Sequence, residues 1–183
     1  MYLKQDLYQK TILFAGEKHK KQKLPVDGLP YVVHLSNVAM EVMFAWESCK
    51  DFDIEYALQL ALLHDTLEDT ATSYEELAEV FGIEVSTGVF ALTKDKNIEK
   101  YEQMQNSIKK ILDCPKEVGI VKMSDRITNL QKPPKHWNKE KIISYREEAQ
   151  YILESLKFSN KYLAERLSFK IDEYKKYITE PLK

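Results

Sequence analysis

Apolar residues recur along most of this chain at spacings of three and four, which is the period of one face of an α-helix. Residues that interrupt helices are few, because 5 glycines and 6 prolines punctuate 183 residues. No internal repeat or low-complexity linker divides the sequence. The spacing therefore predicts an all-α fold, formed as a single helical domain over residues 1–183 with a substantial core.

Helices are expected wherever this period continues between polar or proline-containing stretches. They cover about 2–20, 32–48, 54–68, 73–81, 83–92, 98–112, 116–130, 139–156 and 161–178. Ser73 and Glu76 have the spacing of a capping box, and 132–137 is predicted to be a structural turn. The last two helices are amphipathic, and their outer faces fit either packing within the chain or a homodimer surface. The sequence leaves both open.

The composition favours a protein of the cytoplasm. With 27 basic and 29 acidic residues the net charge is −2, which gives no support for nucleic-acid binding. Cys49 and Cys114 are too few and too far apart to form a disulfide framework, so a reducing compartment is expected. Residues 1–6 lack the apolar core of a signal peptide, and no run of about 18 apolar residues predicts a membrane span.

One expected helix changes character within a few residues. The apolar run 57–63 leads directly into a polar stretch that contains four ionisable groups. Because residues four apart on a helix share a face, His64 would lie over Glu68. Asp65 would lie over Asp69 in the same way. Burying such groups without partners is costly, so a divalent cation is the simplest neutralising group. A His-Asp doublet also occurs at ordinary helix ends, so this interpretation needs further ligands.

Further candidate ligands occur on both sides of the doublet. His34 opens an apolar helix, and Asp125 lies within another. Together with His64 and Asp65 they form a set of two imidazoles and two carboxylates, which suits Mn²⁺, Fe²⁺ or Zn²⁺. No cysteine joins the set, which argues against a structural zinc site. Taken alone, His34 also fits a hydrogen-bonded histidine of the core.

The candidate ligands belong to a longer series of short motifs along the chain. These motifs lie at Gln22, 30–34, 61–70, 81–82, 92–94 and 121–130. The order His, then His-Asp, then Asp resembles the HD-domain metal-dependent phosphohydrolases. The wider pattern resembles the hydrolase domain of the Rel/Spo alarmone enzymes, from about residue 8 to about residue 156. This resemblance implies an HD-domain helical bundle, with C-terminal helices continuing to about 178.

The resemblance also implies an activity and a substrate. It implies hydrolysis of the 3′-pyrophosphate of ppGpp or pppGpp, giving GDP or GTP and pyrophosphate. The partner would thus be a small-molecule nucleotide, and the preferred cofactor would be Mn²⁺. The chain stops where a synthetase domain would begin, so it resembles a stand-alone small alarmone hydrolase.

Two carboxylates are candidates for the catalytic groups. Glu68 and Asp69 follow the His64-Asp65 doublet by one helical turn. From there a carboxylate can orient an attacking water and accept its proton. Which of the two is the base stays open, because two carboxylates beside a metal need not both be ionised.

Four residues are candidate substrate contacts. Lys96 and Asn129 match positions that contact the substrate in the resembling enzymes, and Asn129 shares a helix face with Asp125. Lys23 belongs to a basic run, 18–23, that fits a phosphate-facing rim or a solvated helix end. The fourth candidate is Lys141, which, like Arg146, can reach the pocket from the helix expected over 139–156.

The chain departs from the family pattern at the base-contacting motif. Where alarmone hydrolases carry Arg-Lys, this chain has Lys23-Leu24-Pro25. Neither Lys nor Leu stacks on a base as a planar guanidinium does. Two alternatives therefore accompany the alarmone hydrolase: an HD phosphohydrolase acting on another phosphorylated nucleotide such as NADPH, and a non-catalytic nucleotide sensor or antitoxin.

Overall fold

The computed structural model describes residues 4–26 and 28–179, so the predicted start of the first helix near residue 2 and position 27 of the next loop lie outside the described part. The helices are α1 (Lys4–Lys18), α2 (Val32–Cys49), α3 (Ile54–Leu63), α4 (Thr66–Asp69), α5 (Tyr74–Phe81), α6 (Ile83–Leu92), α7 (Lys100–Leu112), α8 (Lys116–Asn129), α9 (Lys139–Leu156), α10 (Lys161–Tyr174) and α11 (Lys176–Thr179). No strand occurs among these residues, where a single isolated bridge joins Lys23 to Pro30. The all-α prediction is confirmed.

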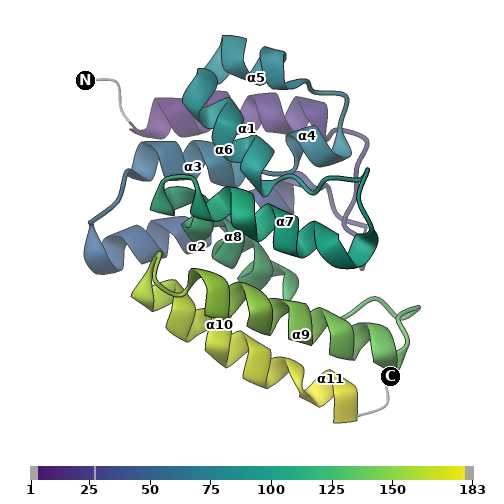
Figure 1. The fold of residues 1–183 in the computed structure, drawn as a ribbon. Coiled ribbons are helices and arrows are strands. Elements are labelled where there is room, and N and C mark those ends of the chain that lie inside the picture. The colour runs from purple at the N-terminus through teal and green to yellow at the C-terminus, as the bar shows by residue number, and fades with distance from the viewer. Residues whose placement is uncertain (1–3, 27, 180–183) are drawn as a thin grey trace.

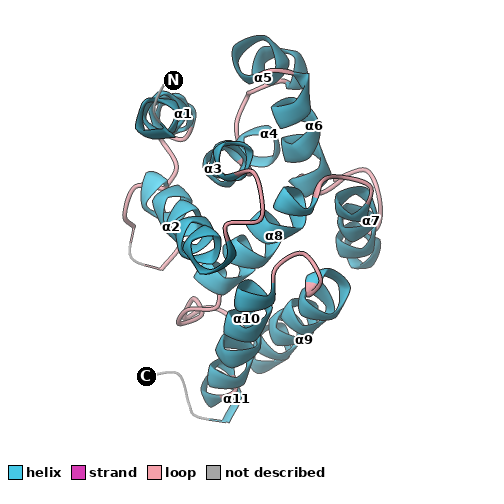
Figure 2. Cartoon of the chain, turned by 90° about the vertical axis from the view of Figure 1, so that its left-hand side faces the viewer, coloured by secondary structure: helices cyan, strands magenta, loops and turns pink. Residues whose placement is uncertain are grey.

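Helix α3 lies at the centre of the fold. It packs against α1, α2, α6 and α8, which surround it in Figure 2. Eight of its ten side chains are buried, and the less buried residues Glu55 and Gln59 lie one turn apart on one side of the helix. Asp53 caps its first turn by accepting hydrogen bonds from the backbone N–H groups of Glu55 and Tyr56. Leu60, Leu62 and Leu63 are fully buried at its C-terminal end, so the segment that follows this helix begins inside the protein.

Helix α8 is the second enclosed helix, and it carries charged residues into the core. Every residue from Glu117 to Ile127 is buried. The charged side chains have partners: Glu117 accepts a 2.8 Å hydrogen bond from the backbone N–H of Asp53, and Arg126 forms an ion pair with Glu148 of α9. This ion pair fits the rule that buried charges are paired.

Helices α9 and α10 form a separate layer beneath α8 (Figure 1). Arg166 of α10 binds Glu41 of α2 through two hydrogen bonds of 2.5 and 2.6 Å, which attaches this layer to the central helices. The single helix predicted over 161–178 is divided at Lys175 into α10 and α11. Within the described part of the chain, no helix combines the length and the apolar composition needed to cross a membrane.

The prediction of one helix over 54–68 is wrong, because α3 ends at Leu63. The hydroxyl of Thr66 donates a 2.6 Å hydrogen bond to the Leu63 carbonyl, and the Nδ1 atom of His64 lies 2.8 Å from the Ala61 carbonyl. In a continuing helix these carbonyls would accept from backbone N–H groups. Side chains satisfy them instead, so the helix ends and the chain turns at Asp65, whose φ is −100° and ψ is 0°.

Other boundaries agree with the sequence. The Ser73 hydroxyl accepts a 3.1 Å hydrogen bond from the Glu76 backbone N–H, which confirms the predicted N-cap of α5. Gly82 then separates α5 from α6 with φ of +93°, a conformation that side chains rarely adopt. The two helices can therefore follow each other without an intervening loop.

The close packing of α6 on α3 gives a stability prediction. A Cβ at Gly88 would lie 2.5 Å from the Tyr56 hydroxyl oxygen and 2.6 Å from Leu60 Cδ2. We expect Gly88→Ala to lower the free energy of unfolding by about 1–3 kcal/mol, measured by urea denaturation. Gly16→Ala in α1 is the control, because its Cβ would meet only Val32 Cγ2 at 3.9 Å. A Gly88→Ala protein as stable as wild type would contradict this packing.

Candidate metal centre and active site

Two imidazoles and a carboxylate, from α2, from the residue that follows α3 and from α8, meet at one place. The candidate ligand atoms of His34, His64 and Asp125 all lie within 4.8 Å of one another. The two Nε2 atoms are 3.3 Å apart, and Asp125 Oδ1 lies 3.4 Å from that of His34 and 3.7 Å from that of His64. All three residues are less than a tenth exposed. Their convergence on one point is the arrangement that a cation would neutralise.

Asp65 adds a second carboxylate to this cluster. Its Oδ2 lies 2.9 Å from His64 Nε2 and 3.8 Å from His34 Nε2. Tyr31 donates a hydrogen bond from its hydroxyl to the same oxygen. The sequence motifs identified Tyr31 only as part of the pattern around His34, and its contact with Asp65 became visible only in three dimensions.

The chemistry of the donor set fits a divalent cation. The Ala61 carbonyl can only accept a hydrogen bond, so His64 must carry a hydrogen on Nδ1. In the neutral ring the lone pair then belongs to Nε2, the atom that faces His34 and both carboxylates. Backbone carbonyls orient metal-binding histidines in this way. His34, His64 and Asp125 thus present two nitrogen donors and one oxygen donor toward one point, and Asp65 Oδ2 lies beside the two imidazole nitrogens.

The same carboxylates control the protonation of His64. Burial disfavours the charged ring, but Asp65 and Asp125 outweigh burial and raise the pKa of His64 well above its ordinary value. Burial also works against ionisation of Asp65, whose pKa is nevertheless lowered to about 2, first by the charge on His64. An added proton on His64 goes to Nε2, so proton and cation compete for one lone pair.

Asp125 is held from its own helix. Lys122 Nζ lies 3.4 Å from Asp125 Oδ2, and the Asn129 amide donates a 2.5 Å hydrogen bond to Oδ1. Although burial opposes ionisation, Lys122 and the neighbouring imidazoles keep the pKa of Asp125 well below its ordinary value. Asn129 lies where the helical spacing predicted. Lys122 was missed, although a lysine inside an apolar run, three residues before Asp125, was a signal for it.

Glu68 and Asp69 extend in two different directions from the short helix α4. The Glu68 carboxylate accepts a 3.1 Å hydrogen bond from the Lys94 backbone N–H. The Asp69 carboxylate accepts a 2.9 Å hydrogen bond from the Gln22 amide. Because a 2.9 Å backbone hydrogen bond joins Asp69 N–H to Asp65 O, Asp69 remains one turn beyond a candidate ligand, as predicted.

An aromatic cleft opens next to His34 and Asn129. It encloses about 370 Å³ and includes residues of the segment 24–26 together with Trp137 and Tyr145 in its lining. The Trp137 and Tyr145 rings meet edge to face at 5.0 Å, so they form a fixed wall. The segment 132–137 was predicted to be only a turn, and its contribution to this cleft was missed.

A second cleft, of about 500 Å³, lies beside α4 and the segment that follows α6. Glu68, Lys94, Lys96 and Lys110 are among its lining residues. The Lys96 ammonium donates a 2.7 Å hydrogen bond to the Glu68 backbone carbonyl. Lysines point charge toward phosphate oxygens without fixing their geometry, so this cleft suits a phosphate group.

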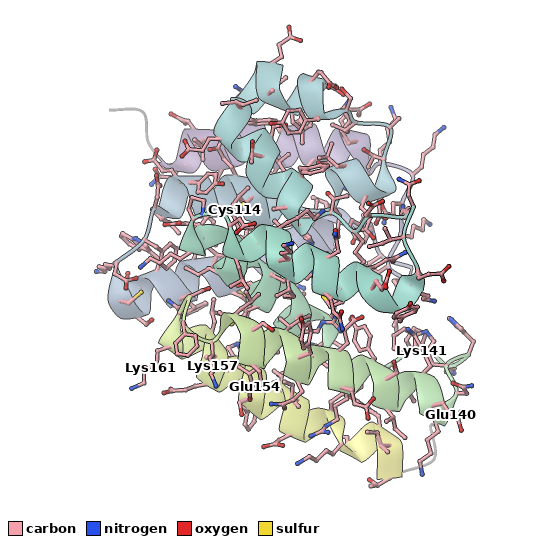
Figure 3. The ribbon with its side chains drawn as sticks, in the orientation of Figure 1. Cys114, Glu140, Lys141, Glu154, Lys157 and Lys161 are labelled. Atoms are coloured by element: carbon pink, nitrogen blue, oxygen red, sulfur yellow. The ribbon has the colours of Figure 1, made fainter. Side chains whose placement is uncertain are left out.

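The remaining two candidate substrate contacts are not brought into either cleft. Lys23 forms the backbone bridge to Pro30, while the next residue, Leu24, begins the part of this segment that lines the aromatic cleft. Lys141 lies at the N-terminal end of α9 (Figure 3), where its ammonium sits 5.3 Å from the centre of the Trp137 ring. Among the described residues, therefore, Lys96 and Asn129 line clefts and Lys23 and Lys141 do not.

Comparisons with known proteins identify relatives of this chain. No protein-family model matches the sequence. The chain is 34% identical over 162 residues to the guanosine-3′,5′-bis(diphosphate) 3′-pyrophosphohydrolase MESH1 of Danio rerio, covering 86% of this chain and 88% of that protein. It is 42% identical over 126 residues to the guanosine-3′,5′-bis(diphosphate) 3′-pyrophosphohydrolase of Aquifex aeolicus, covering 67% of this chain and 17% of that protein.

A solved structure described as a metazoan ortholog of SpoT that hydrolyzes ppGpp has the same fold. It superposes with a TM-score of 0.81 at 28% sequence identity, and the match covers 91% of this chain and 94% of that chain. The arrangement of helices is therefore shared over nearly the whole of both chains.

The raised pKa of His64 gives a pH prediction. Because the protonated ring must lose its Nε2 proton before it binds a cation, we expect apparent Mn²⁺ affinity to strengthen as the pH rises above the range in which an ordinary histidine titrates. Calorimetric titration in buffers of different ionisation enthalpy should detect the released proton. An affinity independent of pH, with no proton released, would contradict this.

Proposed function

The chain belongs to the family of guanosine-3′,5′-bis(diphosphate) 3′-pyrophosphohydrolases, and on this premise we propose that it removes the 3′-pyrophosphate of ppGpp and pppGpp. The products are GDP or GTP and pyrophosphate. The family is one of metal-dependent HD-domain hydrolases, and the described residues include a cluster able to hold a cation. The free thiols of Cys49 and Cys114 support the cytoplasm as the place of action.

One observation carries this proposal: the two imidazole Nε2 atoms face each other at 3.3 Å with carboxylates on either side. We assign His34, His64, Asp65 and Asp125 as the metal ligands. Mixed nitrogen and oxygen donors suit Mn²⁺, which we propose as the cofactor, while Fe²⁺ and Zn²⁺ fit the same set. A non-catalytic sensor would have no physical need of this donor set.

The reaction is the attack of water on the phosphorus attached to the 3′ oxygen of the nucleotide. A bond forms between water and phosphorus, and the bond from phosphorus to the 3′ oxygen breaks. A bound cation supplies Lewis-acid chemistry, because it lowers the pKa of water and polarises a phosphate oxygen. Glu68 and Asp69 orient the water and accept its proton. The 3′ oxygen of the product takes up a proton as the leaving group departs.

The two clefts support one orientation of the substrate. We assign the aromatic cleft beside His34 and Asn129 to the nucleoside, because flat rings bury well against Trp137 and Tyr145. We assign the lysine-lined cleft beside Glu68 to phosphate, with Lys96 as a contact. The candidate ligand His34 lines the first cleft, and Glu68, three residues after the candidate ligand Asp65, lines the second, so we place the scissile bond beside the candidate ligands.

A second candidate substrate is favoured by the lining of the aromatic cleft. Leu24 and Pro25 belong to the stretch that departs from the Arg-Lys pattern of the family, and together with Val26 they contribute apolar surface to the cleft. Without a stacking guanidinium the cleft has less means of selecting guanine. Another phosphorylated nucleotide, such as NADPH, therefore fits the same site.

Product analysis tests these functions directly. The purified chain with Mn²⁺ is incubated with ppGpp, pppGpp and NADPH, and pyrophosphate and phosphate are quantified separately. Release of pyrophosphate and GDP from ppGpp supports the alarmone hydrolase. Release of phosphate from NADPH, with ppGpp intact, supports the second candidate. Absence of turnover with every nucleotide would overturn both.

Substitutions should separate metal binding from turnover. We expect His64→Ala and Asp125→Ala to lose bound Mn²⁺, measured by elemental analysis, because each removes a buried donor. Glu68→Gln should retain the metal and lower kcat by about 10²–10⁴-fold, because it removes a carboxylate that accepts a proton. Controls are His136→Ala and Glu79→Gln, which alter exposed residues away from the cluster. Full activity in Glu68→Gln would overturn its role.

A further inference from the structure

A hydrogen-bonded line approaches Asp69 from the end of α1. His19 is 3% exposed, and its ring stacks on Tyr31 with centroids 4.9 Å apart and an interplanar angle of 27°. Its Nδ1 lies 2.6 Å from Gln22 Oε1. The Gln22 amide then donates its 2.9 Å hydrogen bond to Asp69 Oδ2. A buried ring is thus connected through one side chain to a proposed catalytic carboxylate.

The direction of both hydrogen bonds, from Gln22 to Asp69 and from His19 to Gln22, follows from the acceptor character of the Asp69 carboxylate. The ionised carboxylate of Asp69 can only accept, so Gln22 must present its NH₂ group there. The amide oxygen then faces His19, which must carry its hydrogen on Nδ1. The Nε2 atom of His19 is left as an acceptor, and it has no hydrogen-bond partner among the described residues. Burial also lowers the pKa of His19, which keeps the ring neutral.

Asp69 needs external support more than its neighbours do. It is exposed, and it is the last residue of α4, a helix of 4 residues whose N-cap has no side-chain hydrogen bond. An aspartate in such a place samples several rotamers unless another group holds it. Glu68 is tethered separately, by the Lys94 backbone N–H on the opposite side. The two carboxylates are therefore oriented by different segments of the chain.

We propose that Gln22, itself oriented by the Nδ1–H group of His19, is a positioning residue that fixes the Asp69 carboxylate for the reaction. This inference rests on the proposed function, which gives Asp69 its role. Gln22 touches neither the nucleotide nor the metal in this scheme. Its effect is to keep one oxygen of Asp69 occupied, so that the other is presented to water in a single orientation.

The first test does not depend on activity. Long-range ¹H–¹⁵N correlation spectra of the metal-free full chain report which ring nitrogen of a histidine carries the hydrogen. We expect His19 in wild type to be the neutral Nδ1–H form at neutral pH. Gln22→Met, which has similar volume but no amide, should abolish this preference. An Nε2–H ring in wild type would overturn the proposed line.

The second test is kinetic, with Mn²⁺ and ppGpp. We expect Gln22→Met to lower kcat about tenfold while KM and Mn²⁺ content stay within about twofold. His19→Phe keeps the ring stacked on Tyr31 but removes the N–H group, and it should lower kcat less. The double variant should lose no more than Gln22→Met alone, because His19 acts through Gln22. If the losses of kcat in the two single variants add in the double variant, His19 does not act through Gln22 and the proposal is overturned.

Glu17→Gln is a matched control, because residue 17 takes no part in the hydrogen bonds from His19 through Gln22 to Asp69. Glu17→Gln removes an exposed ion pair with Lys20 at the same end of α1, and its kcat should equal that of wild type. If Gln22→Met raises KM or loses metal with kcat unchanged, the positioning role is overturned. If wild type itself leaves ppGpp intact while His19 is in the Nδ1–H form, the proposed function fails and the hydrogen-bonded line stands.

Discussion

The site depends on how α3 ends. Its last residues are enclosed by other helices, so its unpaired carbonyls cannot turn to water, and they must find donors inside the protein. His64 and Thr66 provide those donors from their side chains. The same hydrogen bond that satisfies the Ala61 carbonyl directs the other nitrogen of His64 toward His34 and Asp125. One hydrogen bond of His64 therefore both ends α3 and orients His64 as a candidate ligand.

Charge inside this fold is balanced at close range. Helix α8 brings Lys122, Asp125 and Arg126 into the core within a single turn. Each of these groups would be costly alone, but each has an opposite charge on its own helix or on α9. This local balance leaves one oxygen of Asp125 facing the imidazoles. The charged residues of α8 thus place the Asp125 carboxylate beside the two histidines without leaving an unpaired buried charge.

The sequence predicted the helices well, because apolar spacing alone determines which segments are amphipathic. It failed at 54–68, where the period continues through His64 and only side-chain hydrogen bonds to carbonyls show the break. The candidate ligands were predicted because their motifs are local. The contacts of Tyr31 with Asp65 and of Gln22 with Asp69 were not predicted, because they join residues more than thirty positions apart. Periodicity carries no information about such pairs.

The candidate ligands come from positions 34, 64, 65 and 125, on or next to helices that already pack against one another through the apolar core. An ion held there would act as a cross-link that closes two long loops of the chain, and it would bind only the folded form. The folded lifetime of the protein would then follow the supply of metal. A shortage of the metal would then lower the resistance of the protein to unfolding and proteolysis, in addition to lowering its activity.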